Sequence, residues 1–263
     1  TFNSIDKKFY NNFIDYCITT KKHSTNTLSR NIGLLKTFMY WAVSNRYTYK
    51  LDFQDFKNIR KEITDEVALT FIQVVEIFEF DFSNNERLER VRDLFVFGCF
   101  TGMRYSNYSK IKKSDIVNKH IKVRDVKDNS KQLNIPLNDY SSYILKKHNY
   151  QLPNITNQKF NEYIKEVIEK VGYTHDIKKT SKLGNKIVET ITPFHKRVSS
   201  HTARRSFITI MKTKRVPDKI IMGFTGHKSL EVFNQYYKPN DEDKIDFMQN
   251  VFKMDNTQLK KVE

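Results

Sequence analysis

Residues 200–207 have the sequence SHTARRSF, which contains the most informative pair of side chains in the chain. His201 and Arg204 stand at positions i and i+3, so a helix would place both on one face. A guanidinium can bind a phosphate through paired N–H donors, and an imidazole can exchange protons near neutral pH. Because a His-x-x-Arg pair is also common by chance, its meaning depends on what flanks it.

Further motifs flank this stretch and contain a second arginine, a second histidine and a pair of tyrosines. They are TGMR at 101–104, GHKS at 226–229 and QYY at 235–237. A tyrosine oxygen can act as a covalent nucleophile where a base and nearby cations lower the cost of ionising it. Each motif is weak alone, since the Gly-His pair could be a simple helix–helix turn and most tyrosines are packing residues. Their order and spacing together favour a single site.

The order of these motifs resembles the pattern of the tyrosine recombinase, or phage integrase, family. That pattern is an Arg after a Thr-Gly turn, a Lys on a β-hairpin, a His-x-x-Arg box, a Gly-His box and a Tyr a few residues later. The residues that match it here are Arg104, Lys127, His201, Arg204, His227 and Tyr236. The sequence SHTARRSF is especially similar to integrases of mobile elements in the Bacteroidetes group. Tyr236, rather than Tyr237, has the family's spacing from His227.

The resemblance implies a site-specific DNA recombinase or integrase that integrates or excises a mobile element. Tyr236 is expected to attack a DNA phosphodiester and to form a 3′-phosphotyrosyl intermediate. Arg104 and Arg204 would stabilise the charge that builds up on the non-bridging oxygens.

The remaining matched residues receive their roles from the same resemblance. His201 would accept or position the proton of the tyrosine, and His227 would donate a hydrogen bond to the phosphate. Lys127 would protonate the departing 5′ oxygen. The reaction would need no cofactor, no metal and no ATP, and the sequence contains neither a phosphate-binding Gly-Lys-Ser/Thr loop nor a His-Glu-x-x-His zinc motif.

Two positions depart from the family pattern. An acidic residue usually follows the first Arg and helps to orient its guanidinium, but here that position is Asn107, which supplies no charge. Val232 and Phe233 stand where small polar residues are common before the nucleophile. These departures concern the level of activity rather than the type of reaction.

Apolar periodicity predicts a mainly α-helical fold with a small β-sheet. A charged stretch at 57–65 without an apolar face predicts a linker. With the resemblance, this implies a helical core-binding (SAM-like) DNA-binding domain at 1–62 and an α+β catalytic domain at 63–263, which would end in a tail helix at about 241–253.

The sequence predicts one β-hairpin clearly and allows a second. Strands are expected at Ile121–Val126 and Gln132–Ile135, on either side of a turn at Asp128–Ser130, with Lys127 at the tip. A second hairpin is allowed around Gly184-Asn185. Nothing in the pattern predicts regular structure between Pro136 and the helix expected from about Thr156.

The net charge of +16 favours a polyanionic partner, although a Lys-rich, AT-rich genome would also produce it. The expected partners are double-stranded DNA recombination sites, a homotetramer on DNA, and DNA-bending factors from the host or the element. No apolar run is long enough for a membrane partner, and two distant cysteines fit a reducing compartment, so the expected location is cytoplasmic and nucleoid-associated. The resemblance also implies a small N-terminal arm-binding domain, which has no counterpart in these residues, and a first residue Thr1 fits that expectation.

Three other interpretations compete with this one. A helical DNA-binding regulator would explain the charge but would make the matched polar residues a coincidence. A metal-dependent nuclease or transposase would use clustered carboxylates, whereas the acidic residues here are scattered along the sequence. A type IB topoisomerase shares the chemistry, but the two-domain layout and the SHTARRSF box favour recombination.

Overall fold

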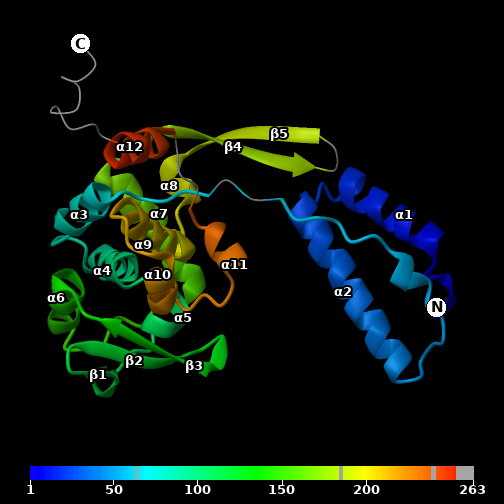
Figure 1. Cartoon of the computed structure of the whole chain (residues 1–263), viewed down its shortest axis with the longest axis horizontal. Helices are drawn as coiled ribbons and strands as arrows, with labels where there is room; N and C mark the ends of the chain where they lie inside the picture. Colours follow the sequence, from blue (N-terminus) through cyan, green and yellow to red (C-terminus); the bar gives the residue numbers. More distant parts are fainter. Residues whose placement is uncertain (63, 65, 184–185, 238–240, 253–263) are drawn as a thin grey trace, which may run out of the picture. The chain divides into compact units, whose positions relative to one another are not determined.

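The chain folds into two compact units in the computed structural model, which describes residues 1–62, 64, 66–183, 186–237 and 241–252 (Figure 1). One unit consists of Thr1–Asp65 together with Asp176–Thr192, and the other of Glu66–His175 together with Pro193–Glu263. None of the helices in the described part of the chain combines the length and the apolar character that a membrane span requires.

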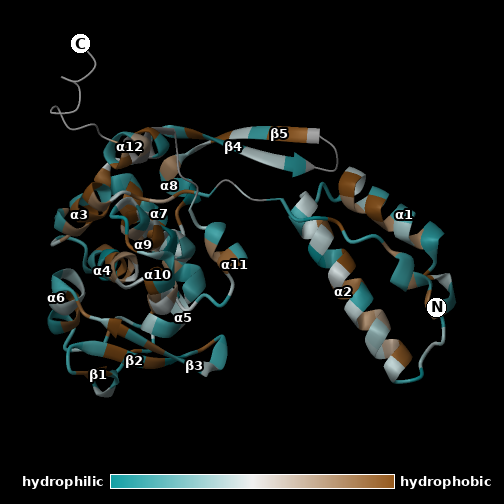
Figure 2. Ribbon diagram, in the orientation of Figure 1, coloured by the Kyte–Doolittle hydropathy of each residue, from teal (hydrophilic) through white to brown (hydrophobic). Residues whose placement is uncertain are grey.

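The first unit is a small helical domain with an added hairpin. Its elements are η1 (Phe2–Ser4), α1 (Lys7–Asp15), η2 (Tyr16–Thr20), α2 (Thr25–Ser44), η3 (Asp52–Asp55), β4 (Asp176–Leu183) and β5 (Lys186–Pro193). Helices α1 and α2 are amphipathic, and Figure 2 shows them as alternating apolar and polar bands. Their apolar faces meet in a core that includes Ile32, Met39 and Phe53. The hairpin that the sequence allowed is present as β4 and β5, while Gly184 and Asn185 lie outside the described residues.

The second unit is built around a buried helix. Its elements are α3 (Phe71–Glu79), α4 (Glu86–Thr101), α5 (Tyr105–Tyr108), η4 (Lys113–Asp115), β1 (Ile116–Val117), β2 (His120–Asp125), β3 (Asp128–Pro136), α6 (Asp139–Lys147), α7 (Asn157–Val171), α8 (Phe194–Arg197), α9 (Ser200–Thr213), α10 (Asp218–Thr225), α11 (Leu230–Asn234) and α12 (Asp241–Val251). Every residue of α4 from Val91 to Thr101 is buried, and helices α3, α6, α7 and α9 pack against it. The predicted mainly α-helical fold with a small sheet is confirmed.

The β2–β3 hairpin differs from the prediction in the position of its turn. The strands pair antiparallel with Ile121 opposite Ile135, but Asp125 is already opposite Asp128, so the turn is Val126-Lys127 and not Asp128–Ser130. Side chains satisfy the main-chain N–H groups of this turn: Asn107 accepts from Val126 at 2.9 Å, and Asp125 accepts from Lys127 at 3.0 Å. These contacts let β3 begin two residues before the predicted turn ends, and they keep Lys127 at the tip.

Helix α6 is an element that the sequence did not predict. It begins after Asn138, whose side chain accepts from the Ser141 N–H at 3.0 Å while the Ser141 hydroxyl accepts from the Asn138 N–H at 2.9 Å. This reciprocal cap is a sequence-level start signal, but the helix is short and buries only Ser141, Ile144 and Leu145. Packing against α4 therefore stabilises it more than its own periodicity does.

Candidate active site

The first arginine motif is placed by the end of the buried helix α4. Gly102 ends this helix with φ +66°, and a Cβ there would overlap the ring of Phe207, so only glycine fits the turn. The chain then leaves the core, and Arg104 precedes α5 with its side chain partly exposed. Its Nη1 donates to the Asp125 carboxylate at 2.5 Å.

The second arginine motif lies on the first turns of α9, which packs directly on α4. The Arg204 side chain is almost entirely buried, with 1% of the residue exposed. Its Nη1 donates to the main-chain oxygen of Gly102 at 3.0 Å, so the two arginine motifs meet at one point. Among the described residues, the buried Nε of Arg204 has no hydrogen-bond partner.

His227 follows Gly226, which ends α10 with φ +73°. The Thr225 hydroxyl donates to the Ile221 oxygen at 2.8 Å, so it must accept from Nδ1–H of His227, which lies at 2.8 Å. Nε2 of a neutral His227 is then an acceptor, and Nη2 of Arg204 lies 3.1 Å from it and 3.3 Å from Nδ1, so Nε2 is the ring nitrogen that can accept from Arg204. Thr225 therefore sets the tautomer of His227, and His227 in turn holds Arg204.

Both histidines lie among cations, but only His227 is buried, whereas His201 is exposed on the first turn of α9. Burial lowers the pKa of His227 to about 3, helped by Arg204, Arg104 and Lys131. Partial desolvation by the surrounding groups also lowers the pKa of His201, although the residue is exposed, and the charges of Arg204 and Arg104 add to the effect. Arg204 remains protonated at neutral pH, since burial and Arg104 lower its pKa only to about 10 and Tyr236 opposes the change. The site thus holds cationic arginines beside neutral imidazoles.

Tyr236 lies beside this buried pair, just after α11. Its ring meets the His227 ring edge-on with centroids 4.8 Å apart, and the Arg204 guanidinium carbon is 5.8 Å from its centre. Arg205 fixes the backbone here by donating to the Gln235 oxygen at 2.9 Å. The ring of Tyr237 instead lies 5.6 Å from the Lys212 ammonium. Of the two tyrosines, Tyr236 contacts the buried Arg204 and His227.

A pocket of about 600 Å³ joins most of the predicted residues. The predicted residues that line it are Arg104, Lys127, His201 and Arg204. The other two, His227 and Tyr236, adjoin it through Arg204. The six side chains selected from the sequence therefore line this pocket or contact a residue that does.

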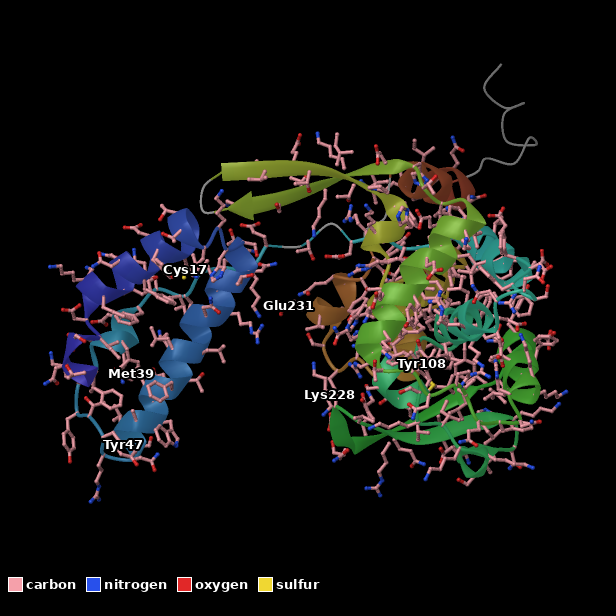
Figure 3. All side chains as sticks on the ribbon, turned by 180° about the vertical axis from the view of Figure 1, so that it is seen from behind. Cys17, Met39, Tyr47, Tyr108, Lys228 and Glu231 are labelled. Carbon is pink, nitrogen blue, oxygen red and sulfur yellow. The ribbon has the colours of Figure 1, made fainter. Side chains whose placement is uncertain are left out.

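The hairpin tip is tied to the Gly-His box by an ion pair. Lys228, labelled in Figure 3 between α11 and the end of the hairpin, pairs with Asp128, the first residue of β3. Hydrogen bonds from the side chains of Lys228 and Ser130 lower the pKa of the Asp128 carboxyl to about 2. Because Asp128 follows Lys127 directly, the contact restrains the residue expected to act as the general acid.

Sequence reasoning missed two side chains of the site. Asp125 holds Arg104, and Thr225 orients His227. Thr225 precedes Gly226-His227 and could have been considered from its position. No sequence signal singles out Asp125, because its link to Arg104 depends on how β2 packs beside α5.

The neutral histidines predict a particular pH dependence of stability. In the unfolded chain a histidine binds a proton near pH 6.5, whereas native His227 does not until about pH 3. Between these values the unfolded state binds more protons, so the free energy of unfolding should fall as the pH is lowered from about 7 to about 5. Urea unfolding should show a weaker fall for His227→Gln than for wild type. Equal pH dependence in both proteins would contradict the buried neutral state.

Comparison with known families assigns both parts of the chain. Residues 68–243 match the family described as "Phage integrase family", and residues 1–59 match the "Phage integrase SAM-like domain". Comparison with curated proteins gives no match.

Similar solved structures share the fold over most of the chain at low sequence identity. A lambda integrase dimer bound to a COC′ core site aligns with a TM-score of 0.67 and 15% identity, over 90% of this chain and 81% of that one. The Tn1549 transposon integrase in complex with transposon right end DNA gives 0.67 and 16%, over 97% and 87%. A lambda integrase tetramer bound to a Holliday junction gives 0.63 and 17%, over 90% and 66%.

Proposed function

The chain belongs to the phage integrase family and is a site-specific tyrosine recombinase, and we propose that it integrates or excises a mobile element through a 3′-phosphotyrosyl intermediate on Tyr236. The SHTARRSF box supports an element of the Bacteroidetes type as its source. Residues 1–62 would act as the core-binding domain and 63–263 as the catalytic domain. The proposed location is the cytoplasm, where the protein would act on the DNA of the nucleoid.

The observation that carries the proposal is the meeting of two guanidiniums at one pocket. Arg104 and Arg204 both line it, together with His201 and Lys127. A buried donor without a partner costs about 1–3 kcal/mol, and Nε of Arg204 is such a donor among the described residues. A phosphate oxygen would satisfy it. Fixed cations of this kind stabilise the charge of a phosphoryl transition state more than that of the ground state.

The proposed reaction proceeds by direct displacement at phosphorus. The Tyr236 oxygen attacks the phosphorus, its proton passes to the neutral His201, and the bond from phosphorus to the 5′ oxygen breaks. Lys127 supplies the proton for the departing 5′ hydroxyl. The lowered pKa keeps His201 neutral at neutral pH, which is the state that can accept a proton, although it also makes the imidazole a weaker base. Rejoining reverses these steps with a different 5′ hydroxyl. Because the phosphotyrosyl bond conserves the energy of the cleaved phosphodiester bond, the reaction requires neither ATP nor metal.

His227 would serve first as a holder of Arg204 and then as a donor to the phosphate. Without DNA its Nε2 accepts from Arg204. When the guanidinium turns towards a phosphate, Nε2 must carry a proton in order to donate, which requires the Thr225 hydroxyl to rotate so that Nδ1 can accept from it. Both arrangements keep the imidazole neutral.

A covalent adduct tests this function directly. A DNA duplex that contains the element's own site and a nick near the scissile phosphate traps the intermediate, because the short cleaved fragment diffuses away. In EDTA, the protein is expected to form an SDS-stable adduct at a 3′ phosphate. A strict metal requirement would favour the nuclease interpretation, and DNA binding without any adduct would favour the regulator.

The proposed partners are duplex recombination sites and further copies of the chain, with DNA-bending factors from the host or the element as additional ones. Support for a homotetramer on DNA comes from the lambda integrase tetramer among the similar structures. Further support comes from α12, the last helix of the described residues, which exposes apolar side chains at Ile245, Met248 and Val251, and from the exposed Phe252 directly after it.

Removal of the tail should separate cleavage from assembly. In a tetramer, α12 would bury its exposed apolar side chains against a neighbouring subunit. Deletion from Asp241 onward is therefore expected to leave adduct formation on a nicked single site intact and to abolish recombination between two sites. The measurement is a gel assay of both reactions with equal protein. Normal recombination by the truncated protein would contradict the role of the tail.

A further inference from the structure

Asp125 is a buried carboxylate at the edge of the proposed active site. It is the last residue of β2 and is 2% exposed. One carboxylate oxygen, Oδ2, accepts from Nη1 of Arg104 at 2.5 Å. The other, Oδ1, accepts from the main-chain N–H of Lys127 at 3.0 Å and from the side-chain amide of Asn107 at 3.3 Å. Each oxygen of this carboxylate therefore has a defined partner.

The carboxylate is ionised at neutral pH despite its burial. Burial alone would raise the pKa of Asp125, but the Lys127 N–H, the charge of Arg104 and the Asn107 amide more than offset it and lower that pKa. A buried charge is stable only where it is paired and hydrogen-bonded, and Asp125 meets both conditions. Removing its charge would leave Arg104 beside other cations.

The neutral side chain of Asn107 is compatible with the carboxylate of Asp125 at the end of β2. Its amide nitrogen donates to Asp125, and its amide oxygen accepts from the Val126 N–H at 2.9 Å. A carboxylate at position 107 could accept from Val126, but it would stand beside Asp125 and repel it. The neutral amide at 107 and the charge at 125 therefore form one matched arrangement around Arg104.

We propose that Asp125 is the positioning residue for Arg104, and that it supplies from β2 the negative charge that Asn107 does not supply from α5. The inference rests on the proposed function, because it assigns Arg104 to the phosphate. Arg104 shares its pocket with Arg204 and Lys127, so cation–cation repulsion would displace it without a fixed counter-charge. Asp125 itself lines no part of that pocket and acts through the guanidinium.

Asp125→Asn tests the proposal with little change of shape. Single-turnover cleavage of the nicked substrate should slow about 10²-fold, the scale of a displaced catalytic group, while DNA affinity stays close to that of wild type. The double variant Asn107→Asp with Asp125→Asn returns one charge to the pair and should recover much of the rate. The matched control is Asp115→Asn, which removes a carboxylate that accepts a main-chain N–H from Lys112 at 2.9 Å, and it should cleave normally.

Asp125 contacts both Arg104 and the main chain of Lys127, and a second substrate shows through which of the two it affects cleavage. With sulfur in place of the bridging 5′ oxygen, the leaving thiolate needs no proton, so Lys127→Ala should cleave at nearly the wild-type rate. Asp125→Asn should keep its full defect on this substrate. Cleavage of the sulfur substrate by Asp125→Asn at the wild-type rate would overturn the proposal. Cleavage of the ordinary oxygen substrate by this variant at the wild-type rate would overturn it as well. Failure of wild type to cleave either substrate would instead reject the proposed function, and the inference with it.

Discussion

Tyr236→Phe is expected to abolish covalent attachment of DNA while leaving DNA affinity nearly unchanged. The substitution removes only the attacking oxygen and keeps the ring that packs edge-on against His227. Removal of the nucleophilic side chain from an active site typically reduces the rate by at least about 10⁴-fold. The amount of covalent adduct should therefore fall below detection. The measurement is SDS gel analysis of the nicked substrate, together with a binding titration on the same DNA.

Tyr237→Phe is the matched control for this variant. Tyr237 is the adjacent tyrosine, and its ring lies near Lys212. Its replacement should leave most of the cleavage activity, and peptide mapping of the wild-type adduct should place the DNA on Tyr236. An adduct mapped to Tyr237 would show that the spacing from His227 had been assigned to the wrong tyrosine.

Arg204→Ala is expected to lower cleavage by about 10²–10³-fold, because it removes a preorganised donor from the phosphate. It should also lower the free energy of unfolding. The Gly102 oxygen would lose its donor inside the core, at a cost of about 1–3 kcal/mol. Arg204→Lys keeps the charge, but one ammonium cannot reproduce the forked contacts to both Gly102 and His227. We therefore expect the lysine variant to be more stable than the alanine variant and still slow.

Single-turnover cleavage and urea unfolding measure these two effects separately. Arg87→Ala is the control, because it removes an arginine that pairs at the surface with Glu166 at 2.9 Å. An exposed ion pair contributes little to stability, so this variant should cleave and unfold nearly as wild type does. Cleavage by Arg204→Ala at the rate of Arg87→Ala would exclude the guanidinium from the reaction.

The long helices could be predicted from the sequence because their apolar residues either recur at helical spacing or form a run long enough for a buried helix. Helix α7 shows this most clearly: it is capped by Thr156, buries Phe160 and Ile164, and ends at Gly172. Some short elements could not be predicted in this way. Helix α6, strand β1 at Ile116–Val117 and the position of the hairpin turn depend on contacts from distant segments, and local patterns do not record such contacts.

The residues of the candidate site could be chosen from the sequence, since their types and spacings are themselves the pattern of the family. Their relations to one another come from tertiary packing. Arg204 reaches the Gly102 oxygen because α9 lies against α4, and Asp125 reaches Arg104 because β2 ends beside α5. Both contacts join residues far apart in the chain. Their energies come from burying charged and polar groups against specific partners, and only the folded core brings those partners within hydrogen-bond distance.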